Sequence, residues 1–143
     1  MSKSQIENLK RQIEYHKRQI ESIKKYDIAG YKNDIEQEKR RIEDVKKRIS
    51  NLRERKKDKA ESFARDLKNA SSSSRKQSIR ESKKREWERF ADQFEDHKKD
   101  MTKLREKINY YKGLINREKD NIAENKKQIA NRRDHIKRLK QNR

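Results

Sequence analysis

Three consecutive heptads decide the fold, and residues 6–26 spell them as IENLKRQ, IEYHKRQ and IESIKKY. With Ile6 at position a of the repeat, positions a and d are occupied by Ile6, Leu9, Ile13, His16, Ile20 and Ile23. Apolar residues at a and d are typical of a coiled coil, because this spacing keeps one stripe against a partner helix. The stretch therefore predicts a long amphipathic helix.

The repeat extends over most of the chain. One extra residue enters near Asp27, after which positions a and d are Ile28, Tyr31, Ile35, Glu38, Ile42, Val45, Ile49 and Leu52. In the second half, position a recurs without interruption at Trp87, Phe94, Met101, Ile108, Ile115, Ile122, Ile129 and Ile136. We expect a local unwinding or bend to absorb the extra residue.

A serine-rich stretch separates the two halves. Residues 69–74 read NASSSS, and the chain contains no proline that would break a helix elsewhere. Serine favours turns and N-caps because its hydroxyl competes for backbone hydrogen bonds. The sequence predicts helices over about residues 3–68 and 75–140, a turn over about 69–74, and a cap from Ser73 or Ser74.

The two halves match each other when the chain is folded at the serines. Residues whose numbers sum to 146, or to 145 before the extra residue, then share a layer, as do Val45 with Met101 and Leu52 with Phe94. Each polar a or d residue faces an apolar one in this register. The pattern favours an all-α fold, an antiparallel coiled-coil hairpin of two long helices spanning residues 1–143 as a single unit. A parallel dimer is the alternative, and the half-polar layers favour a further partner helix or self-association.

Composition excludes several classes of protein. Of 143 residues, 48% are charged and 27% hydrophobic, the formal net charge is +19, and cysteine is absent. Such a chain does not form an ordinary compact core, and it has no disulfides or thiolate sites. No apolar run reaches about 18 residues, so we expect neither a membrane span nor an ordinary Sec signal. We expect a cytoplasmic location, with secretion by a non-Sec route left open.

Basic residues occupy position e in both halves. The first row is Lys10, Lys17, Lys24, Lys32, Lys39, Lys46 and Arg53, and the second is Lys98, Arg105, Lys112, Lys119, Lys126, Arg133 and Lys140. In an antiparallel pair the two e rows line the same side. Glutamates three residues before several lysines offset the first row, whereas the second row is largely uncompensated.

Several interpretations of these rows stay open. A basic row is often only a solvated face, but it also suits an acidic helix, an acidic protein patch or a phosphate backbone. Nucleic acid is the second choice, because the chain has neither a separate basic arm nor an aromatic row for base stacking. A structural spacer or filament protein is a third reading.

The residues that catalysis requires are not assembled in recognisable motifs. The sequence has no Gly-rich phosphate loop, no HExxH and no nucleophile elbow. His16 and His97 fall at seam positions, where a polar layer is a more frequent role than metal binding. We predict that the protein is not an enzyme and that it has no cofactor or metal.

Aromatic residues gather near the predicted turn. Trp87, Phe90 and Phe94 share one stripe, with Phe63 on the other helix, and Lys56 and Lys59 are expected near these rings, Lys59 opposite Trp87. The cluster is either a plug that closes the seam or a recognition hot spot. We predict a partner-binding surface made of Trp87 and Phe90 together with Lys98, Arg105, Lys112, Lys119, Lys126 and Arg133.

The chain also resembles a known family of bacterial hairpins. The Ile-rich repeats, Ser71–Ser74 and the segment Trp87-Glu88-Arg89-Phe90-Ala91 are similar to the WxG-type helical hairpins that accompany LXG toxins in type VII secretion, with Trp87-Glu88-Arg89 where that family has Trp-x-Gly. The resemblance implies an adaptor that binds the helical N-terminal region of a toxin and helps to target it.

Overall fold

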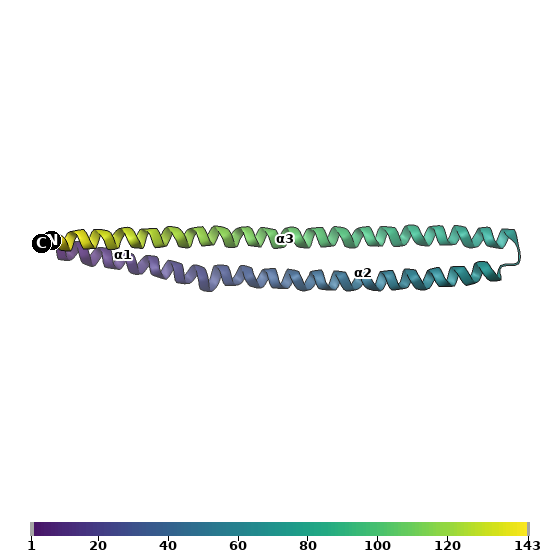
Figure 1. Cartoon of the computed structure of the whole chain (residues 1–143). Coiled ribbons are helices and arrows are strands. Elements are labelled where there is room, and N and C mark those ends of the chain that lie inside the picture. The colour runs from purple at the N-terminus through teal and green to yellow at the C-terminus, as the bar shows by residue number, and fades with distance from the viewer. Residues whose placement is uncertain (1, 143) are drawn as a thin grey trace. The chain divides into compact units, whose positions relative to one another are not determined.

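The computed structural model describes residues 2–142, and among them it contains helices and no strand. The order is α1 (Ser2–Ser22), the π-helical segment η1 (Ile23–Ile28), α2 (Ala29–Asn69) and α3 (Ser73–Gln141), as Figure 1 shows. The first three elements pack antiparallel against α3. The predicted fold class, an all-α helical hairpin, is confirmed.

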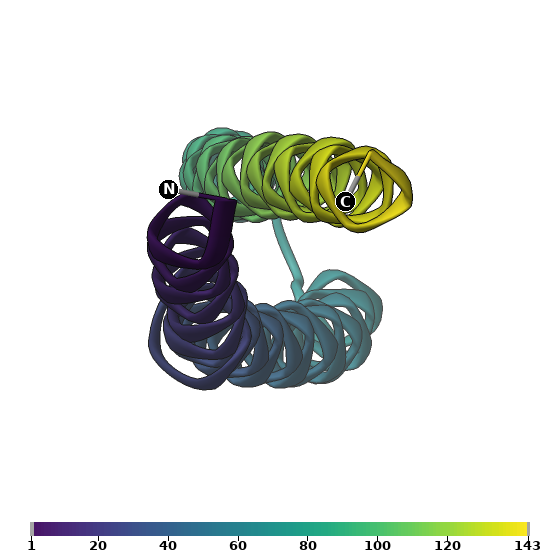
Figure 2. The same ribbon diagram turned by 90° about the vertical axis from the view of Figure 1, so that its left-hand side faces the viewer.

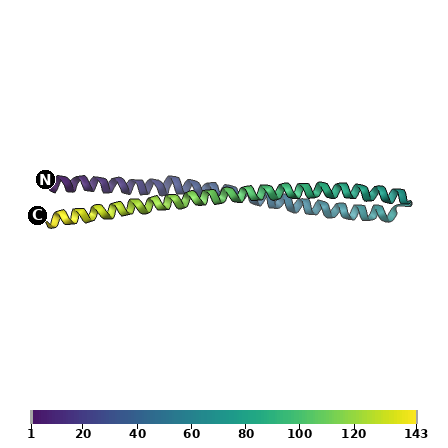
Figure 3. The ribbon, with the colours of Figure 1, turned by 90° about the horizontal axis from the view of Figure 1, so that it is seen from above.

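The chain divides into two compact units. The first consists of Met1–Gln37 and Lys107–Arg143, and the second of Glu38–Glu106. In the first unit, α1 lies beside the last part of α3, with the start of α1 and the end of α3 at the same end (Figures 1 and 3). Figure 2 looks at this end of the unit. In the second unit, α2 lies beside the first part of α3, and the connecting turn closes the pair.

The seam of the first unit is built from the predicted isoleucine stripes. Its buried side chains all occupy positions a and d, and they are Ile6, Leu9, Ile13, Ile23, Ile28, Ile35, Ile108, Ile115, Ile122 and Ile129. Tyr31 and Tyr111 stack across this seam with their ring centroids 6.4 Å apart. Burial of apolar stripes supplies most of the stability of such a pair, since isolated helices gain little from propensity alone.

The extra residue near Asp27 is absorbed by η1. A π-helical turn closes its hydrogen bonds over five residues instead of four, and so accommodates one surplus residue without ending the helix. Ile23 and Ile28, five residues apart, are both 8% exposed and therefore both reach the seam. The π-helical segment is the local unwinding expected from the sequence.

Polar seam residues of the first unit contact one another. A hydrogen bond of 2.8 Å joins Nδ1 of His16 and Oδ1 of Asn125, and Nε of Arg132 donates to Oε1 of Gln12 at 2.7 Å. In the layers predicted from the sequence, His16 and Asn125 each face an isoleucine. In the structure the two side chains instead meet each other diagonally across the seam. A buried polar group gains from such a partner because an unpaired one loses its hydration.

The turn of the second unit is shorter than predicted, and its cap is one residue earlier. α2 ends at Asn69 and α3 begins at Ser73. Oγ of Ser72 accepts a hydrogen bond of 3.1 Å from the backbone N–H of Arg75, so Ser72 is the N-cap and the prediction of Ser73 or Ser74 is wrong. All four serines have the same capping chemistry, and the length of the turn selects between them.

The seam of the second unit changes its pattern near the turn. Val45, Leu52, Phe90 and Met101 are buried at predicted positions. Farther along α2, Ala60, Phe63 and Leu67 are half-buried, while the heptad d residues Lys59 and Asp66 are exposed. The helix therefore turns apolar side chains inward in place of the charged residues that a strict heptad would bury.

One carboxylate lies inside the second unit. Glu38 is 4% exposed, and its Oε1 accepts a hydrogen bond from Nη1 of Arg41 one turn along α2. Its other oxygen, Oε2, has no hydrogen-bond partner among residues 2–142. A half-satisfied buried carboxylate weakens the seam around it.

Candidate functional site

The predicted basic row of α3 is exposed along its whole length. Lys98, Arg105, Lys112, Lys119, Lys126 and Arg133 are all exposed. Within residues 2–142, no ion pair or hydrogen bond engages any of their side-chain nitrogens. The structure thus leaves this row without a carboxylate partner, as the sequence comparison of the two rows indicated.

The basic row on the opposite helix is only partly offset by glutamates. Lys17 pairs with Glu14 at 3.5 Å and Lys46 with Glu43 at 3.3 Å, one turn apart in each case. These side chains are about half exposed, so each pair contributes little to stability. Lys24 makes no such pair within the described residues. The row is therefore uncompensated at Lys24, within η1.

The two rows meet in the first unit around a shallow hollow of about 430 Å³. Its apolar floor consists of Ile28 from η1 with Ile122 and Ala123 from α3. Four lysines surround this floor, two from each side of the seam, and they are Lys24, Lys32, Lys119 and Lys126. We call this surface the lysine groove. It lies beside the π-helical segment.

The lysine groove has the electrostatics of an anion site. Its lining contains no carboxylate, and none of its four ammonium groups is paired within the part of the chain that the structure describes. Four positive charges therefore line one hollow, where an anionic partner would reduce their mutual repulsion, and the apolar floor adds a contact for an aliphatic side chain.

The aromatic cluster lies in the second unit and surrounds Trp87. Its ring centroid is 5.9 Å from that of Phe63 and 5.8 Å from that of Phe90, with edge-to-face geometry in both pairs. Phe90 is 7% exposed and packs inside the seam, whereas Trp87 is only half-buried. Of the two aromatic residues predicted to bind a partner, Trp87 therefore offers the accessible surface.

Lysines approach the cluster, though not all of those expected. Nζ of Lys56 lies 5.5 Å from the centroid of Trp87 and 5.9 Å from that of Phe94. The sequence placed Lys59 opposite Trp87, but Phe63 and Lys56 contact the indole, and Lys59 lines a separate hollow with Phe90. The shift follows from the change of seam pattern near the turn, which leaves Lys59 exposed, while Phe63 keeps heptad position a and stays half-buried.

Sequence reasoning missed a second group of cations near Trp87. Arg80, Lys83 and Lys84 line a hollow together with the indole, and Nζ of Lys83 lies 5.2 Å from its centroid. The heptad of α3 held the signal. Continued upstream of Trp87, it places the charged residues Arg80 and Lys83 at positions a and d, which apolar residues usually occupy.

Two further features are absent from the described residues, a metal site and a membrane-spanning helix. Within residues 2–142, no group of three or more His, Asp and Glu side chains is arranged to hold a metal ion. None of the helices in this part of the chain is long and apolar enough to cross a membrane.

Comparison with known protein families, with curated proteins and with solved structures found no match. Function is therefore inferred from the lysine groove and the surroundings of Trp87.

Proposed function

We propose that this protein is a non-enzymatic coiled-coil adaptor that binds an acidic, helical protein partner through its basic rows. One observation carries the proposal: four unpaired lysines from both sides of the seam surround an apolar floor in the lysine groove. Association with an acidic partner removes the repulsion and covers that floor.

A helix is the partner element that fits this arrangement best. A two-helix seam leaves a groove along which a third amphipathic helix can lie. Aliphatic residues of that helix would pack on Ile28 and Ile122, and glutamates on its flanks would reach the lysines on either side.

The resemblance to type VII hairpins suggests one concrete partner of this class, the helical N-terminal region of an LXG-type toxin. A cytoplasmic site of action belongs to the same proposal.

The experiment uses a synthetic helix as the probe. The probe is a fluorescently labelled peptide of about four heptads, with leucine at a and d and glutamate at e and g. Its binding to the full chain is followed by fluorescence anisotropy at physiological salt. We expect saturable binding that weakens roughly tenfold in Lys119→Glu/Lys126→Glu, because each exposed ion pair contributes about 0.2–1 kcal/mol and reversal replaces it with repulsion.

Two controls make the titration specific. Arg117→Glu/Lys127→Glu changes the same charge on exposed positions of the same helix that do not line the lysine groove, and should leave binding almost unchanged. Equal losses of affinity in both variants would mean that diffuse positive charge is sufficient for binding. That result would refute the assignment of the binding site to the lysine groove. Duplex DNA is titrated in parallel. DNA that binds more tightly than the helix, with a steep salt dependence, would favour the nucleic-acid reading instead.

A further inference from the structure

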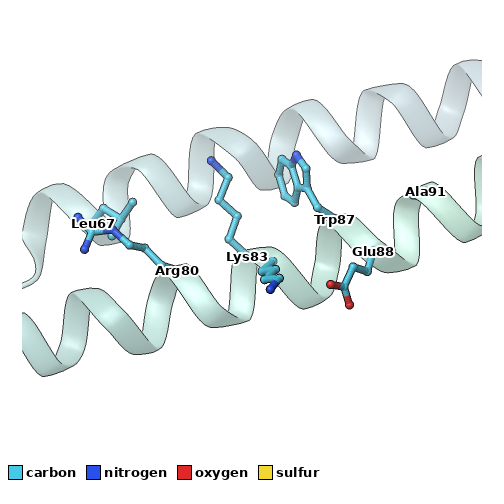
Figure 4. A pocket seen from close by; sticks show the side chains of 7 residues that line it. Leu67, Arg80, Lys83, Trp87, Glu88 and Ala91 are labelled. Atoms are coloured by element: carbon cyan, nitrogen blue, oxygen red, sulfur yellow. The ribbon is translucent and has the colours of Figure 1, made fainter.

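The second unit has a hollow of its own beside the turn, of about 590 Å³ (Figure 4). Its apolar wall combines Leu67 of α2 with Trp87 and Ala91 of α3. Arg80, Lys83 and Lys84 form its rim. We call it the Trp87 hollow. It belongs to a different unit from the lysine groove and shares no residue with it.

The indole is held in place by its neighbours. Phe63 and Phe90 contact it edge-to-face, and the ammonium groups of Lys56 and Lys83 lie over the ring at 5.5 and 5.2 Å from its centroid. Aromatic pairs and cation–π contacts of this kind orient a ring without covering it completely. Trp87 therefore presents a preformed apolar surface, which reduces the entropy lost when a ligand binds.

The rim has a strong excess of positive charge. Three cations line it against one carboxylate, that of Glu88. Among residues 2–142, neither the three cations nor Glu88 forms an ion pair. The hollow therefore combines an apolar wall with unpaired cations in its lining, and this combination is complementary to an apolar side chain flanked by carboxylates.

We infer that the Trp87 hollow binds an aliphatic side chain of an acidic peptide segment, as a second anchor for the protein partner. The inference rests on the proposed function only in assuming that the partner is an acidic protein. A nucleobase fits less well, because it would have to displace an ammonium group of Lys56 or Lys83 to stack on the indole. The apolar wall would also contribute nothing to a phosphate contact.

Trp87 is the single tryptophan of the chain, so its fluorescence reports on this hollow alone. The probe is the blocked hexapeptide Glu-Glu-Leu-Leu-Glu-Glu, titrated into the full chain while tryptophan emission is recorded. The control peptide has serine in place of both leucines and carries the same charge. We expect a saturable change in emission with the leucine peptide and binding about tenfold weaker or more with the serine peptide.

Matched variants locate the binding. Arg80→Glu/Lys84→Glu reverses the rim while keeping the indole as the reporter, and should weaken the leucine peptide by about tenfold. Lys99→Glu/Lys103→Glu makes the same charge change at exposed positions on α3 within the same unit, outside the hollow, and should leave the titration unchanged. Circular dichroism verifies that each variant keeps its helices.

Several outcomes would overturn the inference. Equal binding of the leucine and serine peptides, equal losses in the two charge variants, or an equal response to duplex DNA would each show that the hollow does not select an apolar side chain. The Lys119→Glu/Lys126→Glu variant separates this result from the proposed function. Its tryptophan titration should match that of the parent even if helix binding to the lysine groove fails.

Discussion

Deleting Asp27 should restore a continuous heptad repeat without disturbing the seam of the first unit. Asp27 is exposed and has no side-chain partner in the described part of the chain. Without it, Ile20 and Ile28 stand seven residues apart, and the same holds for Ile23 and Tyr31. The π-helical segment then becomes ordinary α-helix, while the residues on both sides keep their layers against α3. We expect the free energy of unfolding to stay equal or to rise.

A matched deletion supplies the contrast. Asp120 is also an exposed aspartate of the first unit without a side-chain partner among residues 2–142, but it lies in the uninterrupted repeat of α3. Its deletion rotates Ile122 and Ile129, now 8% and 7% exposed, out of phase with the seam. Burial of an isoleucine side chain contributes about 1.5–3 kcal/mol, so the predicted loss is on the order of 3–6 kcal/mol.

The assay is urea or thermal unfolding of the parent chain and of both deletions, followed by circular dichroism. The two deletions remove the same residue type and the same charge, so the difference between them isolates the phase of the heptad. A loss from the Asp27 deletion as large as that from the Asp120 deletion would refute the reasoning, because η1 would then be needed for pairing instead of absorbing a surplus residue.

Three further predictions concern the second unit. Cysteines at Val45 and Met101, which are 5% and 7% exposed, should form an intramolecular disulfide at low protein concentration, whereas exclusively intermolecular cross-links in gel analysis would contradict the hairpin. Leu52→Ala, at a side chain with 0% exposure, should lower the unfolding free energy by about 3–5 kcal/mol, and the half-buried Leu104→Ala should cost less. Glu38→Leu should raise the midpoint of thermal unfolding through a gain of about 1–2 kcal/mol, since it removes a half-satisfied buried carboxylate, and a lower midpoint would mean that the carboxylate is needed.

Apolar periodicity was sufficient to predict the fold class. Isoleucines spaced by seven, such as Ile108, Ile115 and Ile122, can bury their side chains only along one stripe, and an equally long stripe lies in the other half of the chain. The surplus residue near Asp27 was also visible, because it breaks this spacing once. Its form, a π-helical turn, depends on backbone hydrogen bonding that side-chain periodicity does not encode.

Details near the turn were less predictable, because several residues compete for each position there. Four consecutive serines offer the same hydroxyl, so the cap at Ser72 follows from turn length and not from residue type. The heptad placed Lys59 at the seam, but Ala60 is the half-buried residue because a charged group costs more to bury. The rim of the Trp87 hollow was not predicted, because the heptad analysis of the second half began at Trp87 and left out Arg80 and Lys83.

The residues of the basic rows were predictable from the sequence, but the surface that they form together was not. Position e identified Lys119 and Lys126 directly, and the structure adds that Lys24 and Lys32 approach them around an apolar floor. The approach depends on η1, because the surplus residue sets the spacing between Lys24 and Lys32. Sequence patterns supply the charge of each row, while the local helix geometry decides where the two rows converge.

A charge-swap titration tests the central claim most directly. The lysines of the lysine groove, Lys24, Lys32, Lys119 and Lys126, are replaced together by glutamate, and the labelled glutamate-flanked helix is compared with a helix of identical length that has lysine at e and g. We predict that the variant no longer binds the glutamate helix. Its affinity for the lysine helix should be about equal to the affinity of the parent chain for the glutamate helix. Continued binding of the glutamate helix to the variant, or failure of the lysine helix to bind it, would contradict the account.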